Sequence, residues 1–339
     1  MAFADESETT SPLQSYLELL RLPNVFTAVA DVAMGFFFVQ AAWAFSSDGQ
    51  QQSLLPIGLW TIGLLAAASA LLYSAGMVLN DVFDIELDRE EQPDRPLPSG
   101  RISLSSARWL GWQLLILGIL LASGTAVMLG KFQPTHTDNF VIAWLPAIVA
   151  TALAMLIVLY NAVLKRTPLG PLAMGGCRMF NVLLGMSALR EPWRIEHWAV
   201  AAGIGVYIAG VTWLARNDTR RSDRWQLIAA TLVMLAGVGL VGSLPWLTDK
   251  LWMLHQPQSE LWRWHTIIAL LAGFVLVRCG SAIAQPSPGP VRAAVHRSIA
   301  ALIFLDAAAC YAGAGPSYAI LVAVLVVPTT LVGRWVDRG

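Results

Sequence analysis

The sequence predicts an all-α membrane protein, a polytopic helical bundle with about nine to ten transmembrane helices. Of its 339 residues, 56% are hydrophobic and 13% are charged, and this charged share is roughly half that of an ordinary soluble domain. Apolar runs of about 20 residues, long enough to cross a bilayer, recur along the whole chain. Clusters of Pro and Gly separate several of these runs, as loops between helices require.

The expected helices follow one another without an intervening soluble domain. We expect spans at residues 23–45, 55–79, 107–130, 140–164, 168–189, 197–215, 226–248, 262–285, 292–313 and 317–335. The Pro-rich breakers at 92–100 and 285–290 follow the second and eighth spans. The sequence therefore predicts two parts: a polar N-terminal segment over residues 1–22 and a single transmembrane domain over residues 23–339.

The distribution of basic residues predicts the orientation of the bundle. Most of the 22 Lys and Arg residues fall in the even-numbered loops and near the two termini. Basic loops remain in the cytoplasm, so we expect both termini and these loops to face the cytoplasm in a multi-pass protein of the cell inner membrane. Positive charges are balanced by 22 acidic residues, which excludes nucleic-acid binding through a basic surface.

An acidic window closes the second expected helix on its cytoplasmic side. Asp81, Asp84 and Asp88 have the spacing i, i+3, i+7, which places three carboxylates on one face of a continuous helix. Such carboxylates repel one another unless a cation joins them, and Mg²⁺ commonly bridges carboxylates to substrate phosphates. The alternative is a solvated acidic helix end. Because Asn80 precedes the aspartates and Arg89 and Arg95 follow them, we favour a metal–phosphate site.

Two further polar clusters lie on the same side. The segment at 216–224, after the sixth span, carries the carboxylates of Asp218 and Asp223 and four arginines. Together with the first window it could hold a metal–diphosphate, with guanidiniums neutralising phosphate oxygens; it could equally be an ordinary positive-inside loop. The segment at 160–168, after the fourth span, carries Lys165 and Arg166, which suit a diphosphate or a topology anchor.

The segments at 80–89 and 93–101 together resemble the first aspartate-rich signature of the UbiA superfamily, and 160–168 is similar to the family's Tyr…Leu-Lys-Arg-x-Pro element. Members are intramembrane prenyltransferases that attach an isoprenoid chain to an aromatic or other lipid-building acceptor. The resemblance implies a UbiA-like fold with a lateral opening to the bilayer, Mg²⁺ as cofactor and a polyprenyl diphosphate as donor. The implied acceptor is a small aromatic or lipid compound, and we favour an aromatic one. Segments at 21–32 and 178–187 also resemble the EboC-type bacterial branch of UbiA-like proteins.

The resemblance implies a role for each matching residue. The implied metal ligands are Asn80, Asp81, Asp84, Asp88, Asp218 and Asp223, of which Asp81, Asp84 and Asp218 are the implied catalytic residues. The implied diphosphate-binding residues are Arg95, Lys165, Arg166 and Arg221. Residues expected to line the substrate pocket are Asn24, Asp31, Tyr160 and Arg178.

The second aspartate signature departs from the family pattern. The family presents two aspartates four residues apart, but Ser222 stands four residues after Asp218, and Asp223 follows one residue later. On a helix this step rotates a side chain by about 100°. The departure favours an alternative function, a carrier or transporter of a prenylated or aromatic precursor with weak or no catalysis. The intact first signature favours the prenyltransferase.

Three ionisable residues stand inside otherwise apolar spans: Asp31, Arg178 and Asp306. Charged groups are costly in lipid, so we expect them to face the bundle interior and to pair. The sequence predicts an ion pair between Asp31 and Arg178 near the pocket. The alternative is that Asp31 contacts substrate while Arg178 reaches a backbone carbonyl.

Overall fold

The computed structural model describes residues 11–44, 55–132, 140–189, 192–216, 223–249, 251–257 and 259–336, and this part of the chain is helical throughout its regular structure. The first half contains α1 (Pro12–Leu19), α2 (Leu22–Ala44), α3 (Leu55–Phe83), α4 (Ile85–Glu91), α5 (Leu104–Phe132), α6 (Phe140–Ala143), α7 (Leu145–Ala162), the 3₁₀ turn η1 (Leu164–Arg166) and α8 (Gly170–Met186). The second half contains α9 (Ile195–Ala215), α10 (Arg224–Gly242), α11 (Leu244–Leu247), the 3₁₀ turn η2 (Trp252–His255), α12 (Ser259–Ala284), α13 (Pro288–Ala314), α14 (Pro316–Ala323) and α15 (Val326–Val336).

Nine segments of the described chain are helical, long and apolar enough to cross a membrane, which confirms the polytopic all-α class. The expected span at 168–189 is the shorter α8, which has 17 residues and carries Arg178. The expected span at 317–335 forms two consecutive helices, α14 and α15. Gly315 precedes them with a φ of 89°, a left-handed conformation that suits glycine at a helix end, and Pro316 begins α14.

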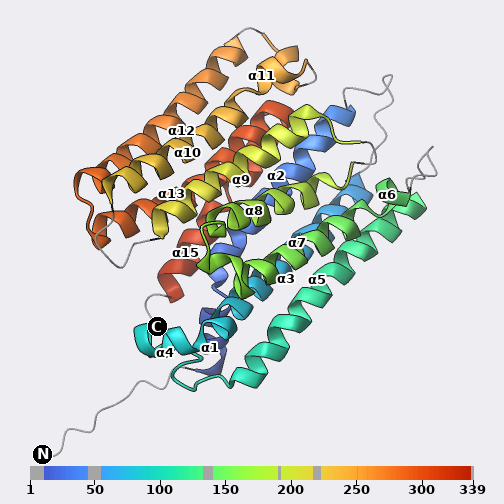
Figure 1. The fold of residues 1–339 in the computed structure, drawn as a ribbon. Coiled ribbons are helices and arrows are strands. Elements are labelled where there is room, and N and C mark those ends of the chain that lie inside the picture. The colour runs from blue at the N-terminus through green and yellow to red at the C-terminus, as the bar shows by residue number, and fades with distance from the viewer. Residues whose placement is uncertain are drawn as a thin grey trace, which may run out of the picture.

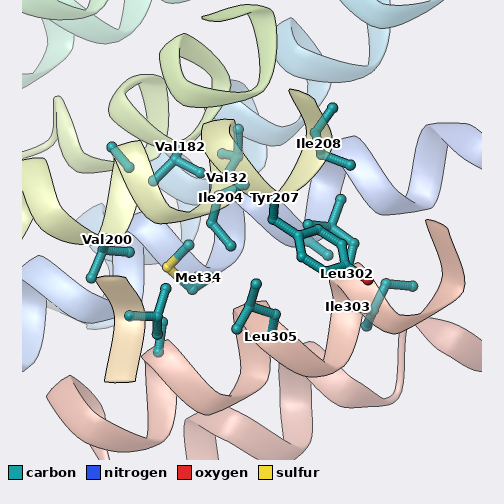
Figure 2. Close-up of a cluster of buried hydrophobic side chains, with 14 of the residues drawn as sticks. Val32, Met34, Val182, Val200, Ile204, Tyr207, Ile208, Leu302, Ile303 and Leu305 are labelled. Carbon is teal, nitrogen blue, oxygen red and sulfur yellow. The ribbon is translucent and has the colours of Figure 1, made fainter. Parts of the chain in front are cut away.

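The long helices lie side by side as a bundle, with the short helices α1 and α4 at one end and α6 and α11 at the other (Figure 1). α2 is central: it packs against α3, α8, α13 and α15. A continuous apolar core fills the space between α2, α8, α9 and α13, with Val32, Val182, Ile204 and Leu302 among its fully buried members (Figure 2). This apolar packing fixes the positions of the helices that carry the buried polar residues.

Two glycines bring α2 and α8 into close contact. A Cβ atom on Gly185 would lie 2.2 Å from the carbonyl oxygen of Val32, and one on Gly35 would lie 2.4 Å from that of Val182. Since real Cβ atoms do not approach backbone oxygens so closely, only glycine permits this helix–helix distance. The close approach also places the polar residues of α2 and α8 directly opposite each other.

A second, smaller core lies at the end of the bundle that carries α1 and α4. Leu19 of α1 is buried against Val78 and Val82 of α3 and against Leu97 and Ile102 of the following loop. Arg101 reinforces the contact with an ion pair to Glu18, 3.1 Å between Nη1 and Oε2. Part of the polar segment expected over residues 1–22 thus folds onto the transmembrane helices.

Candidate active site

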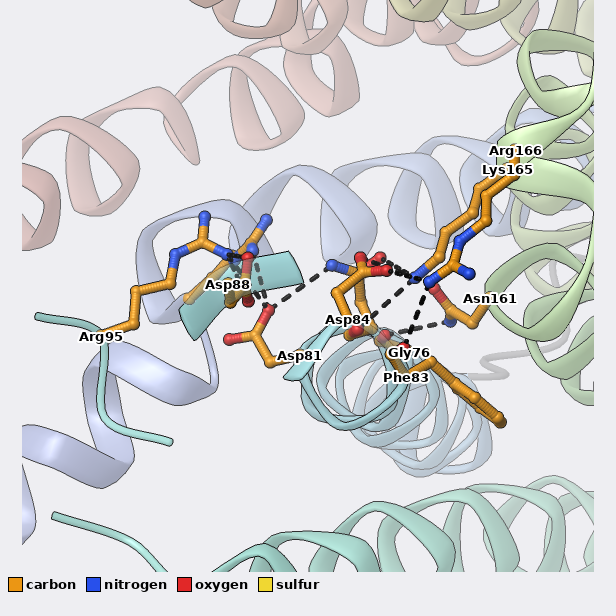
Figure 3. Close-up of polar contacts among 11 residues, drawn as sticks. Gly76, Asp81, Phe83, Asp84, Asp88, Arg95, Asn161, Lys165 and Arg166 are labelled. Atoms are coloured by element: carbon orange, nitrogen blue, oxygen red, sulfur yellow. Dashed lines mark hydrogen bonds and ion pairs between the residues drawn. The ribbon is translucent and has the colours of Figure 1, made fainter. Parts of the chain in front are cut away.

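The aspartates of the acidic window lie at the end of the bundle that carries α1 and α4, where α3 passes into α4. The expected single helical face for Asp81, Asp84 and Asp88 is wrong, because α3 ends at Phe83 and α4 begins at Ile85, with Asp84 at the break. The carboxylates therefore divide between two sets of basic partners, on either side of α3 (Figure 3).

On one side, Arg95 joins two aspartates. Its Nη1 donates to both carboxylate oxygens of Asp88, at 3.1 and 3.0 Å, and lies 3.8 Å from Asp81 Oδ1. Arg21, between α1 and α2, donates from Nη2 to the same Asp81 oxygen at 3.0 Å. Asp81 and Asp88 are buried, so these guanidiniums supply the compensation that buried carboxylates need.

On the other side, the basic pair of η1 holds Asp84. Lys165 Nζ donates to Asp84 Oδ2 at 2.7 Å and to Asn80 Oδ1 at 3.2 Å, and Arg166 Nη2 donates to Asp84 Oδ1 at 3.2 Å. Burial lowers the pKa of Lys165, and the hydrogen bond and charge of Asp84 oppose this shift. The segments at 80–89 and 160–168, both of which resemble UbiA signatures, are therefore in direct contact.

A cavity of about 240 Å³ lies between α2, α3, α7, α8, α9 and α13. Arg21, which pairs with Asp81, belongs to its lining and connects it to this layer of charges. The end of the cavity near the charged layer is formed by Arg21, Asn24, Tyr160 and Asn161, and its walls include the apolar side chains of Leu153, Ile157, Ile208 and Val211. Arg178, Asn181 and Tyr73 provide a polar floor. Three of the four residues expected in the pocket, Asn24, Tyr160 and Arg178, line this cavity.

The fourth, Asp31, lies behind the floor and pairs with Arg178. Arg178 Nη1 lies 2.9 Å from Asp31 Oδ2, and Asp31 is fully buried. The predicted ion pair is confirmed. Thr27 accepts a second hydrogen bond from the guanidinium at 2.8 Å, and the guanidinium carbon lies 5.3 Å from the centroid of the Tyr73 ring.

The second acidic loop is described only at its edges. Asp218, Arg221 and Ser222, and with them the altered spacing of the second signature, lie outside the described residues. Asp223 is exposed and caps α10 by accepting a hydrogen bond from the backbone N–H of Trp225 at 3.2 Å. Within the part of the chain that is described, no three His, Cys, Asp or Glu side chains converge as a metal-binding group.

Several residues of the site were not among the sequence candidates. Arg21 has a φ of 48°, the only non-glycine residue of the described chain in the left-handed region, and this turn directs its guanidinium to Asp81. A loop arginine before a helix gives no sequence signal of that conformation. Asn181 belongs to a helical apolar run, where only the position of a neighbouring charge on another helix could have marked it.

The fold and the site thus define a multi-pass membrane protein with a largely apolar cavity beside a layer of carboxylates and basic groups. The UbiA prenyltransferase family model matches residues 33–278, and the chain belongs to that family. No comparison tests the narrower EboC-type placement, which stays a prediction.

Individual relatives extend the comparison. A digeranylgeranylglyceryl phosphate synthase of Saccharolobus solfataricus is 38% identical over 110 residues, 32% of this chain and 34% of the relative. The chain spans between about a third and a half of the length of the first such relatives. The solved structure of a digeranylgeranylglyceryl phosphate synthase has a TM-score of 0.60 at 21% identity and covers 90% of this chain and 99% of its own. A UbiA homologue from Archaeoglobus fulgidus bound to GPP and Mg²⁺ has a TM-score of 0.57 at 14% identity, covering 91% and 99%. These structures show the shared fold.

Proposed function

We propose that the protein transfers a prenyl group from a polyprenyl diphosphate to a small acceptor within the membrane, in a Mg²⁺-dependent reaction. The observation that carries this proposal is the junction of an apolar cavity with a layer of carboxylates and bases. A prenyl diphosphate has the same two parts, an apolar chain and a multiply charged head group. The family membership and the ligands of the Archaeoglobus fulgidus relative support the same substrate class.

The donor set suits Mg²⁺. Asn80, Asp81, Asp84 and Asp88 offer hard oxygen ligands at one end of the cavity, and Mg²⁺ typically takes one or two carboxylates together with substrate phosphates. We assign these four residues, with Asp218 and Asp223 of the second loop, to metal binding. Asp81, Asp84 and Asp218 are the proposed catalytic residues, and bound Mg²⁺ would neutralise the charge that develops on the diphosphate leaving group.

Three basic residues that pair with the aspartates are proposed diphosphate ligands: Arg95, Lys165 and Arg166. Arg221, from the second loop, is the fourth proposed ligand. Arg95, Lys165 and Arg166 can each exchange a carboxylate oxygen for a phosphate oxygen, which frees the carboxylates for the metal. The apolar walls exclude water, which would otherwise convert the allylic cation to a prenyl alcohol. Asn24 and Tyr160 flank the reacting end, and the Asp31–Arg178 pair closes the floor.

The acceptor belongs to one of two chemical classes. The resemblance of the sequence favours a small aromatic compound. The curated relatives are named for a glyceryl phosphate product, which favours a lipid-building glycerol phosphate. We propose further that the charged layer faces the cytoplasm at the inner membrane, because the positive-inside rule places the basic loops there.

Pyrophosphate release by the protein in lipid nanodiscs tests the proposal. The reaction contains Mg²⁺, geranylgeranyl diphosphate and either an aromatic acceptor pool or geranylgeranylglyceryl phosphate. We expect release that an acceptor stimulates, that Asp81→Ala/Asp84→Ala abolishes and that Glu86→Gln/Glu90→Gln retains, since the last two side chains are exposed members of the same acidic window. Mg²⁺-dependent binding of the diphosphate without release would overturn the transferase and favour a carrier on this fold.

A further inference from the structure

The floor of the cavity belongs to a polar network deep inside the bundle. Asn181 of α8 donates from Nδ2 to Asp31 Oδ2 at 3.0 Å, and its own Oδ1 accepts from Ser69 of α3 at 2.7 Å. Arg178 donates to the same Asp31 oxygen. The Oδ2 atom of Asp31 is thus doubly satisfied, whereas its Oδ1 atom is buried and has no hydrogen-bond partner among the described residues.

Asp306 of α13 is the unexplained member of this network. It lies seven residues after Ile299, which lines the cavity, so both occupy the same face of α13 two turns apart. Its side chain is fully buried, and neither carboxylate oxygen has a donor within the described chain. Asp306 lies next to Asp31, because α13 packs directly against α2 and both side chains are fully buried there. Their carboxyl groups are close enough to interact.

The network contains one acid more than its cations can balance. Three titratable groups interact electrostatically with Asp306: Asp31 from α2, Arg178 from α8 and Cys310 one turn further along α13. Tyr73 from α3 contacts Arg178. Only Arg178 is cationic, and Asp31 is its ion-pair partner. A second buried carboxylate without a counter-ion is costly in a low-dielectric interior, and two adjacent carboxyls do not both ionise.

We propose that Asp31 and Asp306 form an intramembrane proton-binding site, in which Asp306 carries the proton and donates it to Asp31 Oδ1. One proton pairs two of the three unpartnered oxygens, restores electrical neutrality and leaves Asp31 ionised for Arg178. A metal cation would need several further oxygens, and the nearby carbonyl of Ala28 already accepts from Ser69 and Asn181. The site holds α2, α8 and α13 together behind the cavity floor and does not depend on prenyl transfer.

Infrared spectroscopy tests for the proton directly. The protein is purified in an ester-free detergent at pH 7, where exposed aspartates are ionised, with and without ¹³C-labelled aspartate. We expect the carbonyl stretch of a protonated carboxylic acid, shifted by the aspartate label and absent from Asp306→Asn. Glu260→Gln is the matched control, because Glu260 is also buried but hydrogen-bonds Tyr311 and pairs with Arg263; the band should remain. Absence of the band from the unaltered protein, its persistence in Asp306→Asn, or its appearance only when Na⁺ is withdrawn would overturn the proposal.

Thermal unfolding provides a second readout that separates a proton donor from simple space filling. Asparagine can donate to Asp31 Oδ1 as the protonated acid does, so we expect Asp306→Asn to keep the melting temperature of the unaltered protein. Leucine has a similar size and no donor, so Asp306→Leu should lower the melting temperature by several degrees. Equal stability of these two variants, or a loss in Asp306→Asn as large as in Asp306→Leu, would contradict the assigned hydrogen bond.

Discussion

Replacing Arg178 with glutamine is expected to destabilise the bundle by about 3–5 kcal/mol, because removing one partner of a buried ion pair leaves the other charge uncompensated. The geometry supports a value in this range: the pair is separated by 2.9 Å and Asp31 has no exposure to solvent. Folded proteins are stable by only about 5–15 kcal/mol, so the loss is a large fraction of the total. Asp31→Asn should also destabilise, but less, since Asp306 can release its proton and pair with Arg178.

The decisive result is the double variant Asp31→Asn/Arg178→Gln, which removes both charges. The free energy of unfolding of each variant is measured by detergent titration. The loss in the double variant should be smaller than the sum of the two single losses by at least about 1.5 kcal/mol, as for contacting residues in a double-mutant cycle. Arg89→Gln serves as the control, because Arg89 and Glu86 form an exposed pair and such pairs contribute about 1 kcal/mol or less. Direct coupling between Asp31 and Arg178 would be refuted if the double variant were no more stable than either single variant and its loss equalled the sum of the two single losses.

Three further outcomes follow from the site and the helix packing. Arg95→Ala should weaken binding of geranylgeranyl diphosphate by roughly 10- to 100-fold, the equivalent of one or two charge-assisted hydrogen bonds. Arg101→Ala leaves the contact between Arg95 and Asp88 in place and should retain the affinity of the unaltered protein. Equal affinities of Arg95→Ala and the unaltered protein, measured by calorimetry, would contradict the assignment of Arg95. Burial lowers the pKa of Lys165, so its charge is lost as pH rises through that lowered pKa. Diphosphate affinity should therefore fall in the alkaline range at a lower pH than an exposed lysine would allow, whereas Lys165→Arg should bind the diphosphate up to higher pH. Coincident pH profiles of the two proteins would contradict the role of Lys165. Gly185→Ala should cost about 1–3 kcal/mol by overpacking, whereas Gly124→Ala, where a Cβ meets nothing within 4 Å, should leave the unfolding free energy unchanged or raise it.

The membrane class could be predicted because it depends on local composition. Apolar runs as long as the bilayer is thick, interrupted at Pro-rich segments, specify helices whatever their partners are. The limits of several helices still moved: α3 extends to Phe83, beyond the expected end of the span at residue 79. In this last turn Lys165 donates to Asn80 and Arg21 donates to Asp81, so segments distant in the sequence support it. Hydropathy alone does not register that support.

The site was predicted in composition but not in arrangement. The spacing of Asp81, Asp84 and Asp88 indicated one carboxylate face, yet the backbone breaks at Asp84 and directs it to Lys165. The pairing of Asp31 with Arg178 could be predicted because each charge needs a partner in the membrane. The position of Asp306 beside Asp31 could not, because it depends on how α13 is rotated against α2, and that rotation is set by packing distributed over both helices.

The central claim, prenyl transfer rather than hydrolysis or carriage, is tested most directly by identifying the product. The protein in nanodiscs is supplied with Mg²⁺, geranylgeranyl diphosphate and one acceptor at a time, and the lipid extract is analysed by mass spectrometry. The account predicts a prenylated acceptor that is absent without Mg²⁺ and absent from Asp81→Ala/Asp84→Ala. Recovery of intact diphosphate, or of prenyl alcohol alone, with every acceptor of both classes would contradict it.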